Sequence, residues 1–288
     1  MTDDQTGPTR ILTADGTHLG VRQIDGDGTL VVALHGFTGD GSTMVDLVEK
    51  CRGARPALLV DLVGHGVSDS PEHPETYSMA SVVDQVLSLI GPREPGSTHL
   101  IGYSMGGRVA LSMAARAPWY FASVTSISST PGIDEPTDRA RRYDQDQQLA
   151  DRVEQIGVDE FVDEWLELDL FGPYRALLTD DALTATRTQR RSNSVLGLAN
   201  SLRSTGTGSM PPLWQSLESF RSPLLAIAGA LDTRYVEIAE QMAQGVPSGE
   251  LHVVADAGHV VHVENCDEVG TRIAKFLEVC ESHGDLHS

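Results

Sequence analysis

Apolar runs that end in glycine-containing turns recur along this chain and predict its fold. Leucine and β-branched residues dominate these runs, which alternate with segments long enough to form helices. Runs that are apolar on both faces are typical of parallel strands covered by helices on either side. We therefore expect an α/β fold, in which a mostly parallel central sheet is flanked by helices. The six strand-like runs occupy residues 30–36, 57–66, 98–107, 121–129, 223–232 and 250–259.

The chain between about residues 133 and 213 has a different pattern, which predicts helices only. Apolar residues recur there at spacings of three and four, and charged residues fill the intervals. A block of this length exceeds an ordinary crossover between two strands. We therefore predict an α/β core made of residues 1–132 and 214–288, with residues 133–213 inserted as a helical lid. A last amphipathic helix is expected over residues 264–280, and a frayed tail after it.

The charge of the chain limits its partners. Among its 288 residues, 41 are acidic and 21 are lysine or arginine, which gives a formal net charge of -20. Nucleic acids and anionic membranes would be repelled, and an anionic substrate requires arginines concentrated in its site. Lys50 and Lys275 are the only lysines. A GC-rich genome explains the scarcity of lysine but not the excess of carboxylates, so we favour adaptation to high salt, where charge repulsion is screened.

The cysteines, the N-terminal residues and the apolar runs indicate in which cellular compartment the protein is expected. Cys51, Cys266 and Cys280 form no C-x-x-C pair, so neither a disulfide framework nor a zinc site is expected. The first ten residues are acidic and polar, unlike a signal peptide, and no apolar run approaches the roughly 20 residues that cross a bilayer. We expect a soluble, cytoplasmic protein without membrane insertion; the pattern indicates no oligomeric state.

The sequence "IGYSMGGR" at residues 101–108 is the first candidate for chemistry. Gly102, Ser104 and Gly106 form the G-x-S-x-G pattern, which in a sharp strand-to-helix turn exposes the serine hydroxyl. A serine between glycines also occurs in plain turns. Here a strand-like run precedes the pattern and a helix-like segment follows it, which favours a nucleophile elbow.

A serine hydroxyl needs a base to activate it, and the base needs a carboxylate to orient it. Asp232 ends one late strand-like run and His259 follows the next, in the chain order Ser, Asp, His expected for this architecture. Asp256 is the rival acid, but it lies on the same short turn as His259. We therefore predict a triad of Ser104, His259 and Asp232, with Asp256 as a turn residue.

Two further histidines have simpler interpretations. His262 and Glu264 lie close to His259 and could suggest metal ligands, but no third ligand is evident, so we expect a surface histidine at a helix N-terminus. His65, within "GHG", is expected to be a structural turn residue. Neither a metal nor a cofactor is predicted.

The sequence "LHGFTGD" predicts the site for a developing negative charge. In this fold the loop after the third strand contributes one backbone N–H to an oxyanion hole, and the residue after the serine contributes the other. Those positions are Phe37 and Met105.

At this point the chain resembles the α/β-hydrolase family over essentially its whole length. More narrowly, it is similar to the 2-succinyl-6-hydroxy-2,4-cyclohexadiene-1-carboxylate synthases of menaquinone biosynthesis. The narrower resemblance rests on "HGFTGD", "GYSMGGRVAL", "AGHVVHVEN" and, above all, the lid sequence "GLANSLRSTGTGSMPPLW". Two positions depart from the family pattern: Val63 stands where proline is usual, and Met210 where glutamine is common.

This resemblance implies a lyase rather than a hydrolase. The family eliminates pyruvate from 2-succinyl-5-enolpyruvyl-6-hydroxy-3-cyclohexene-1-carboxylate, a small polycarboxylate. The resemblance also implies that the Ser104 oxygen, activated by His259 and Asp232, removes a ring proton instead of attacking a carbonyl. Matches to family substrate-binding positions fall on Arg108, Arg142, Arg190, Tyr103 and Trp165. The match at Arg190 leaves Arg187 and Arg191 open as alternatives, and each lid arginine could equally lie on a solvated helix face.

Two other functions compete with this interpretation. A hydrolase of esters, thioesters or carbon–carbon bonds would use the same triad and oxyanion hole, but an apolar ester pocket has no need of three arginines. A binding protein on the same fold could use the lid cavity as a receptor, but it has no need of an intact triad. The lyase remains the favoured prediction.

Overall fold

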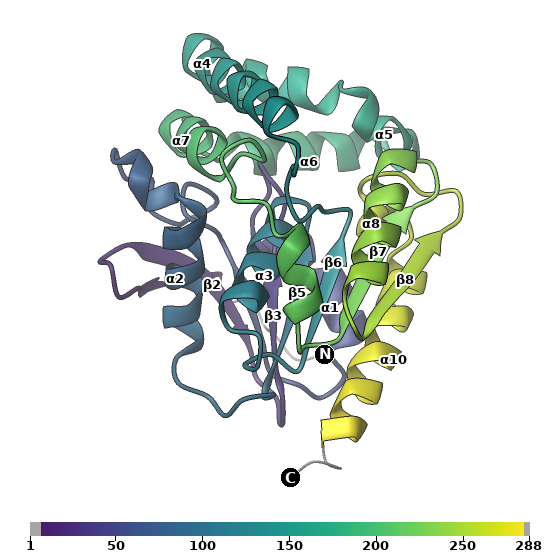
Figure 1. Cartoon of the computed structure of the whole chain (residues 1–288). Helices are drawn as coiled ribbons and strands as arrows, with labels where there is room; N and C mark the ends of the chain where they lie inside the picture. The colour runs from purple at the N-terminus through teal and green to yellow at the C-terminus, as the bar shows by residue number, and fades with distance from the viewer. Residues whose placement is uncertain (1–6, 285–288) are drawn as a thin grey trace.

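The computed structural model describes residues 7–284, which form an eight-stranded sheet with helices on both faces (Figure 1). The strand order is β1-β2-β4-β3-β5-β6-β7-β8, and β2 alone runs in the direction opposite to the other strands. The predicted α/β-hydrolase fold is therefore confirmed. The strands are β1 (Thr9–Leu12), β2 (His18–Ile24), β3 (Leu30–Leu34), β4 (Ala57–Val60), β5 (Thr98–Tyr103), β6 (Ser123–Ile127), β7 (Leu224–Gly229) and β8 (Gly249–Val254).

The two faces of the sheet are covered by different helices. Along β3, Leu30, Val32 and Leu34 join a core shared with α2 (Met79–Ile90), α3 (Met105–Arg116) and α8 (Thr233–Gly245). The alternate residues Val31 and Ala33 join a second core with α1 (Val45–Cys51) and α10 (Cys266–Gly284). Successive side chains of a strand point to opposite faces, so a strand buried on both faces must be apolar throughout.

A helical layer lies across the carboxyl ends of the parallel strands (Figure 1). Its own small core includes Val153, Phe161 and Leu198. The longest helix is broken at Gly157, whose φ of 78° and ψ of 171° are not helical. The layer consists of α4 (Pro136–Leu166), η3 (Asp169–Phe171), α5 (Gly172–Leu177), α6 (Asp180–Arg191) and α7 (Val195–Thr205).

The chain enters and leaves this helical layer at one place, which we call the neck. The backbone N–H of Leu213 donates to the carbonyl of Pro131 at 2.7 Å. The indole N–H of Trp214 donates to the carbonyl of Gly132 at 2.9 Å. These two bonds hold the ends of the intervening segment together.

The remaining elements are short or terminal. The expected last helix consists of a single turn, α9 (Val261–Glu264), followed by α10, while the expected frayed tail falls largely outside the described residues. The short helices η1 (Gly41–Met44), η2 (Pro74–Tyr77) and η4 (Trp214–Ser219) complete the fold. No helix among residues 7–284 is both long and apolar enough to cross a membrane.

Candidate active site

The turn between β5 and α3 presents Ser104 at the carboxyl edge of the sheet. Ser104 has φ 49° and ψ -105°, a conformation that side-chain-bearing residues rarely adopt. A Cβ atom on Gly102 would lie 2.3 Å from the carbonyl oxygen of Gly106, and one on Gly106 would lie 2.2 Å from that of Leu34. The two glycines of the motif are therefore required by close packing around the turn.

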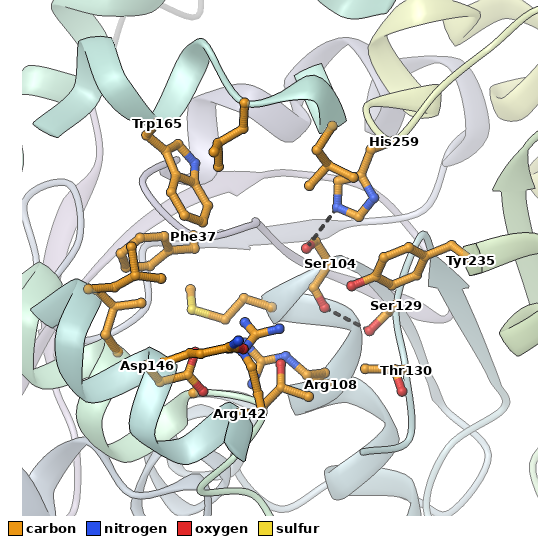
Figure 2. Close-up of a pocket in the computed structure, with 18 of the residues that line it drawn as sticks. Phe37, Ser104, Arg108, Ser129, Thr130, Arg142, Asp146, Trp165, Tyr235 and His259 are labelled. Atoms are coloured by element: carbon orange, nitrogen blue, oxygen red, sulfur yellow. Dashed lines mark hydrogen bonds and ion pairs between the residues drawn. The ribbon is translucent and has the colours of Figure 1, made fainter. Parts of the chain in front are cut away.

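The structure brings Ser104, His259 and Asp232 together, although they lie far apart in the sequence, and Figure 2 shows His259 beside Ser104. His259 Nε2 is 3.2 Å from Ser104 Oγ, and His259 Nδ1 is 2.7 Å from Asp232 Oδ2. A histidine that donates from Nδ1 to the aspartate can accept the serine proton at Nε2. Asp256 lies on an exposed turn at φ 56°, whereas the Asp232 side chain is only 10 % exposed.

Two backbone amides near Ser104 point to a site for negative charge. Neither Phe37 N–H nor Met105 N–H donates a hydrogen bond to another residue in the part of the chain that the structure describes. The loop that carries Phe37 is tied to α3, because Gly106 N–H donates to the carbonyl of His35 at 3.0 Å. Thr38, the next residue, has a φ of 67°. Free amides held in place by a fixed loop and by the start of a helix are the donors that an oxyanion requires.

A cavity of about 580 Å³ lies between the sheet edge and the helical layer. This volume is within the usual range for a small-molecule site. Every site residue predicted from the sequence lines it: Phe37, Tyr103, Ser104, Met105, Arg108, Arg142, Trp165, Arg190, Asp232 and His259.

Two buried arginines in this cavity have no carboxylate partner. Arg108 is 9 % exposed and donates to the carbonyl of Thr205, and Arg190 is 6 % exposed and donates to the hydroxyl of Thr38. Neither forms an ion pair with a described residue. Burial, and then the nearby Arg142 charge, lowers the pKa of Arg108 to about 10; burial also lowers the pKa of Arg190. A buried cation without a counter-ion is costly, so this cavity favours an anionic ligand.

The structure distinguishes the three arginines of α6. Arg187 and Arg191 form ion pairs with Asp163 at 3.1 and 2.6 Å and do not line the cavity. Arg190 instead lines the cavity and donates to the hydroxyl of Thr38. Arg142, on α4, lines the cavity and forms an ion pair with Asp146 at 2.7 Å.

Aromatic rings form the apolar wall of the cavity (Figure 2). The ring centroid of Trp165 is 5.2 Å from that of Phe37 and 5.9 Å from that of Phe171. Tyr103 lies deeper, where burial raises the pKa of its hydroxyl. The cavity thus combines an apolar wall with cationic groups.

The expectation of a surface histidine at position 262 is wrong. His262 is 2 % exposed, and its ring centroid lies 4.1 Å from that of Tyr103. The single turn of α9 points Val261 and His262 into the core, so burial, and then His259, lowers the pKa of His262 to about 3. Among residues 7–284 no group of three His, Cys, Asp or Glu side chains could hold a metal ion.

His65 lies in the turn after β4, where it is almost fully buried. Its Nδ1 is 3.1 Å from the carbonyl of Val63, and its ring packs edge-on against Phe37. Its contacts are those of a structural turn residue that supports the loop of Phe37.

Several residues around the site have no role there that was predicted from the sequence. Glu264 accepts the N–H groups of Gly258 and Val260 and so holds the turn that carries His259. Ser129 donates to the carbonyl of Ser104 at 2.7 Å. Tyr235 places its ring edge-on to His259, with centroids 4.7 Å apart. Asp146 could have been found only from its spacing, four residues after Arg142 on one helix.

The sheet, the elbow and the cavity define the class of protein. A family model for the alpha/beta hydrolase family matches residues 31–271, and the chain belongs to that family. Among its relatives, it is 34 % identical to a putative 2-succinyl-6-hydroxy-2,4-cyclohexadiene-1-carboxylate synthase of Bacillus subtilis, over 94 % of this chain and 98 % of that protein. A synthase of the same name from Yersinia pestis is 28 % identical, over 87 % of this chain and 88 % of that protein.

Solved structures agree with these relatives. The structure of MenH from S. aureus matches with a TM-score of 0.83 and 32 % identity, covering 91 % of this chain and 98 % of that one. A thermophilic esterase from Thermogutta terrifontis matches with a TM-score of 0.80 at 23 % identity, over 96 % of this chain and 99 % of that one, which shows the shared fold alone.

Proposed function

We propose that this protein is a 2-succinyl-6-hydroxy-2,4-cyclohexadiene-1-carboxylate synthase, which eliminates pyruvate from 2-succinyl-5-enolpyruvyl-6-hydroxy-3-cyclohexene-1-carboxylate in menaquinone biosynthesis. One observation carries the proposal beyond the names of the relatives. Arg108 and Arg190 are buried without carboxylate partners in the same cavity as Ser104 and His259. A substrate with several carboxylates supplies the missing counter-ions, whereas a neutral ester leaves both cations unpaired.

In the proposed reaction the triad acts as a base. Asp232 holds His259 with Nε2 free to accept the Ser104 proton, and the Ser104 oxygen removes the ring proton alpha to the succinyl ketone. The electron pair of the broken C–H bond forms an enolate, whose oxygen is held by the N–H groups of Phe37 and Met105.

The second half of the reaction expels the leaving group. As the enolate returns to the ketone, a double bond forms at the deprotonated ring carbon, the existing ring double bond shifts by one position, and the ring C–O bond to the enolpyruvyl group breaks. The leaving oxygen takes up the proton carried by His259, and pyruvate departs as its enol. No acyl group is transferred in this sequence, so no water is required in the cavity.

The helical layer of residues 133–213 is proposed to act as a lid. It contributes Arg142, Trp165 and Arg190 to the cavity, and its two ends meet at the neck. The core then supplies the proton chemistry, and the lid supplies much of the recognition of the carboxylates.

The test is to supply the enolpyruvyl intermediate and to follow pyruvate through a coupled lactate dehydrogenase assay. We expect pyruvate release by the wild-type protein and by Ser219→Ala, which alters an exposed serine outside the cavity, but not by Ser104→Ala. Absence of pyruvate together with rapid turnover of p-nitrophenyl esters would instead identify a serine hydrolase.

A further inference from the structure

A fully buried carboxylate lies next to the arginines of the cavity. Asp146 of α4 is 0 % exposed, and both of its oxygens accept hydrogen bonds. Arg142 Nε donates to Oδ1 at 2.7 Å, and the backbone N–H of Gly208 donates to Oδ2 at 3.0 Å. The Asp146 side chain is therefore fixed from two directions, by its own helix and by a separate loop.

That loop, residues 206–208, and the last residue of α7, Thr205, connect the two arginines. The carbonyl of Thr205 accepts from Arg108 of the core, while the N–H of Gly208 donates to Asp146. A Cβ on Gly206 would lie 2.5 Å from Asp146 Oδ2, which explains why a glycine stands beside the carboxylate. The loop therefore joins Arg108 of the core to the Arg142–Asp146 pair of the lid.

The charges at this end of the cavity do not balance. Arg108 and Arg142 both line this end of the cavity, and the Arg142 charge contributes to the lowered pKa of Arg108; Figure 2 shows the side chains of Arg108, Arg142 and Asp146 grouped together below Ser104. Two guanidinium groups and one carboxylate leave one positive charge, which one carboxylate of a ligand would neutralise.

Arg142 has the greatest freedom of these side chains. It is 32 % exposed, and a long side chain at that exposure samples several rotamers unless a partner holds it. Asp146 is one helical turn away and immobile, so its bond to Nε leaves the two terminal nitrogens of Arg142 for the cavity.

We infer that Asp146 is a positioning residue, which fixes Arg142 beside Arg108 so that the two guanidinium groups bind one carboxylate of the ligand. This inference rests on the proposed function for the identity of that ligand, although any small dicarboxylate that binds there also tests it. Asp146 touches no reacting atom and acts only through Arg142.

A double-mutant cycle separates this role from a structural one. In the wild-type background, Asp146→Asn should lower kcat/KM for pyruvate release roughly tenfold to a hundredfold, the effect of losing one charge-assisted hydrogen bond. In an Arg142→Ala background the same substitution should leave kcat/KM unchanged or raise it, because it removes an unpaired carboxylate that repels the substrate. Asp151→Asn, an exposed acid of the same helix paired with Arg203, is the matched control and should leave kcat/KM unchanged in both backgrounds.

The comparison of the two backgrounds tests the inference even if the Asp146→Asn variant folds less stably. If Asp146 served only the stability of the lid, Asp146→Asn would reduce kcat/KM by the same factor in both backgrounds, and that result would overturn the inference. The same cycle can be measured without turnover, as the Kd of succinate determined by calorimetry. Asp146→Asn should weaken succinate binding in the wild-type background, by the factor expected for kcat/KM, and should not weaken it in the Arg142→Ala background. Wild-type protein that binds succinate but releases no pyruvate would refute the proposed function, and the cycle measured on succinate binding would still test the role of Asp146. Wild-type protein that neither binds succinate nor releases pyruvate would overturn both.

Discussion

Replacement of Arg108 by methionine should make the protein more stable and less active at the same time. The substitution keeps a long unbranched side chain in α3 but removes the buried charge. The pKa of Arg108 falls from 12.5 to about 10, and one pKa unit corresponds to 1.36 kcal/mol, so burial together with the Arg142 charge disfavours the charged form by roughly 3 kcal/mol. Because the pKa of this base is lowered, the penalty applies at every pH below about 10, including neutral pH.

The variant also loses a favourable contact. The hydrogen bond from Arg108 to the Thr205 carbonyl contributes about 1 kcal/mol. The net gain in the free energy of unfolding is then about 2 kcal/mol, equivalent to a rise of roughly 4 °C in Tm for a chain of this size. The loss of a charged contact to the substrate, about 1.5–3 kcal/mol, should reduce kcat/KM for pyruvate release by roughly 10–150-fold.

Thermal unfolding followed by circular dichroism gives Tm, and the coupled pyruvate assay gives kcat/KM. Arg116→Met is the matched control, because Arg116 is on the same helix, half exposed and paired with Asp84, and we expect little change in either quantity. A fall of several degrees in Tm for Arg108→Met, or an equal loss of activity on neutral esters in Arg108→Ala, would refute the reasoning and make the arginine structural.

Three other predictions follow from the site and the charge. Ser104→Ala should reduce pyruvate release at least about a thousandfold, and mass spectrometry during wild-type turnover should find no acyl adduct; an adduct on Ser104 would contradict a proton-abstracting serine. The pKa of His262 is about 3 in the folded protein and about 6.5 in the unfolded chain, so the free energy of unfolding decreases as the pH falls through that interval. His262→Phe should lessen the loss between pH 7 and 4.5 by about 3 kcal/mol. Urea unfolding measures this loss, and a variant with the same pH dependence as the wild type would refute the prediction. The net charge of -20 should make Tm rise from low to molar KCl, and a maximum near zero salt would contradict salt adaptation.

Most of the strands that could be predicted from the sequence are buried on both faces. β3 to β7 begin and end within the apolar runs, because covering helices leave little room for polar residues, whereas the exposed edge strand β8 begins at Gly249, one residue before its run. The hairpin of β1 and β2 was not predicted, because β1 lies at the sheet edge with mostly exposed residues and β2 carries Arg22 and Gln23 among its apolar residues. An edge strand needs only one apolar face, and so its composition is close to that of a loop.

The same distinction applies to the site. Ser104, Asp232 and His259 stand at strand ends, so their convergence follows from the sheet. Asp146 lies in a charge-rich helical segment, where composition indicates a solvated acid, and only the approach of a loop more than 50 residues later buries it. The burial of His262 also depends on tertiary packing, because a single helical turn is too short to show a periodic pattern in the sequence.

The neck has a consequence for how this fold can change. Its two bonds, from Leu213 to Pro131 and from Trp214 to Gly132, bring the ends of the helical insertion together whatever lies between them. Because loop-closure entropy grows only slowly with length, an insertion joined at such a point tolerates replacement by a longer or shorter one. β6 and β7 pair along Val124–Ile127 and Leu224–Ile227 without any residue of the insertion. Chimeras that exchange the insertion between family members at residues 132 and 213 should therefore fold, and substrate preference should travel with the exchanged piece while the proton chemistry stays with the recipient.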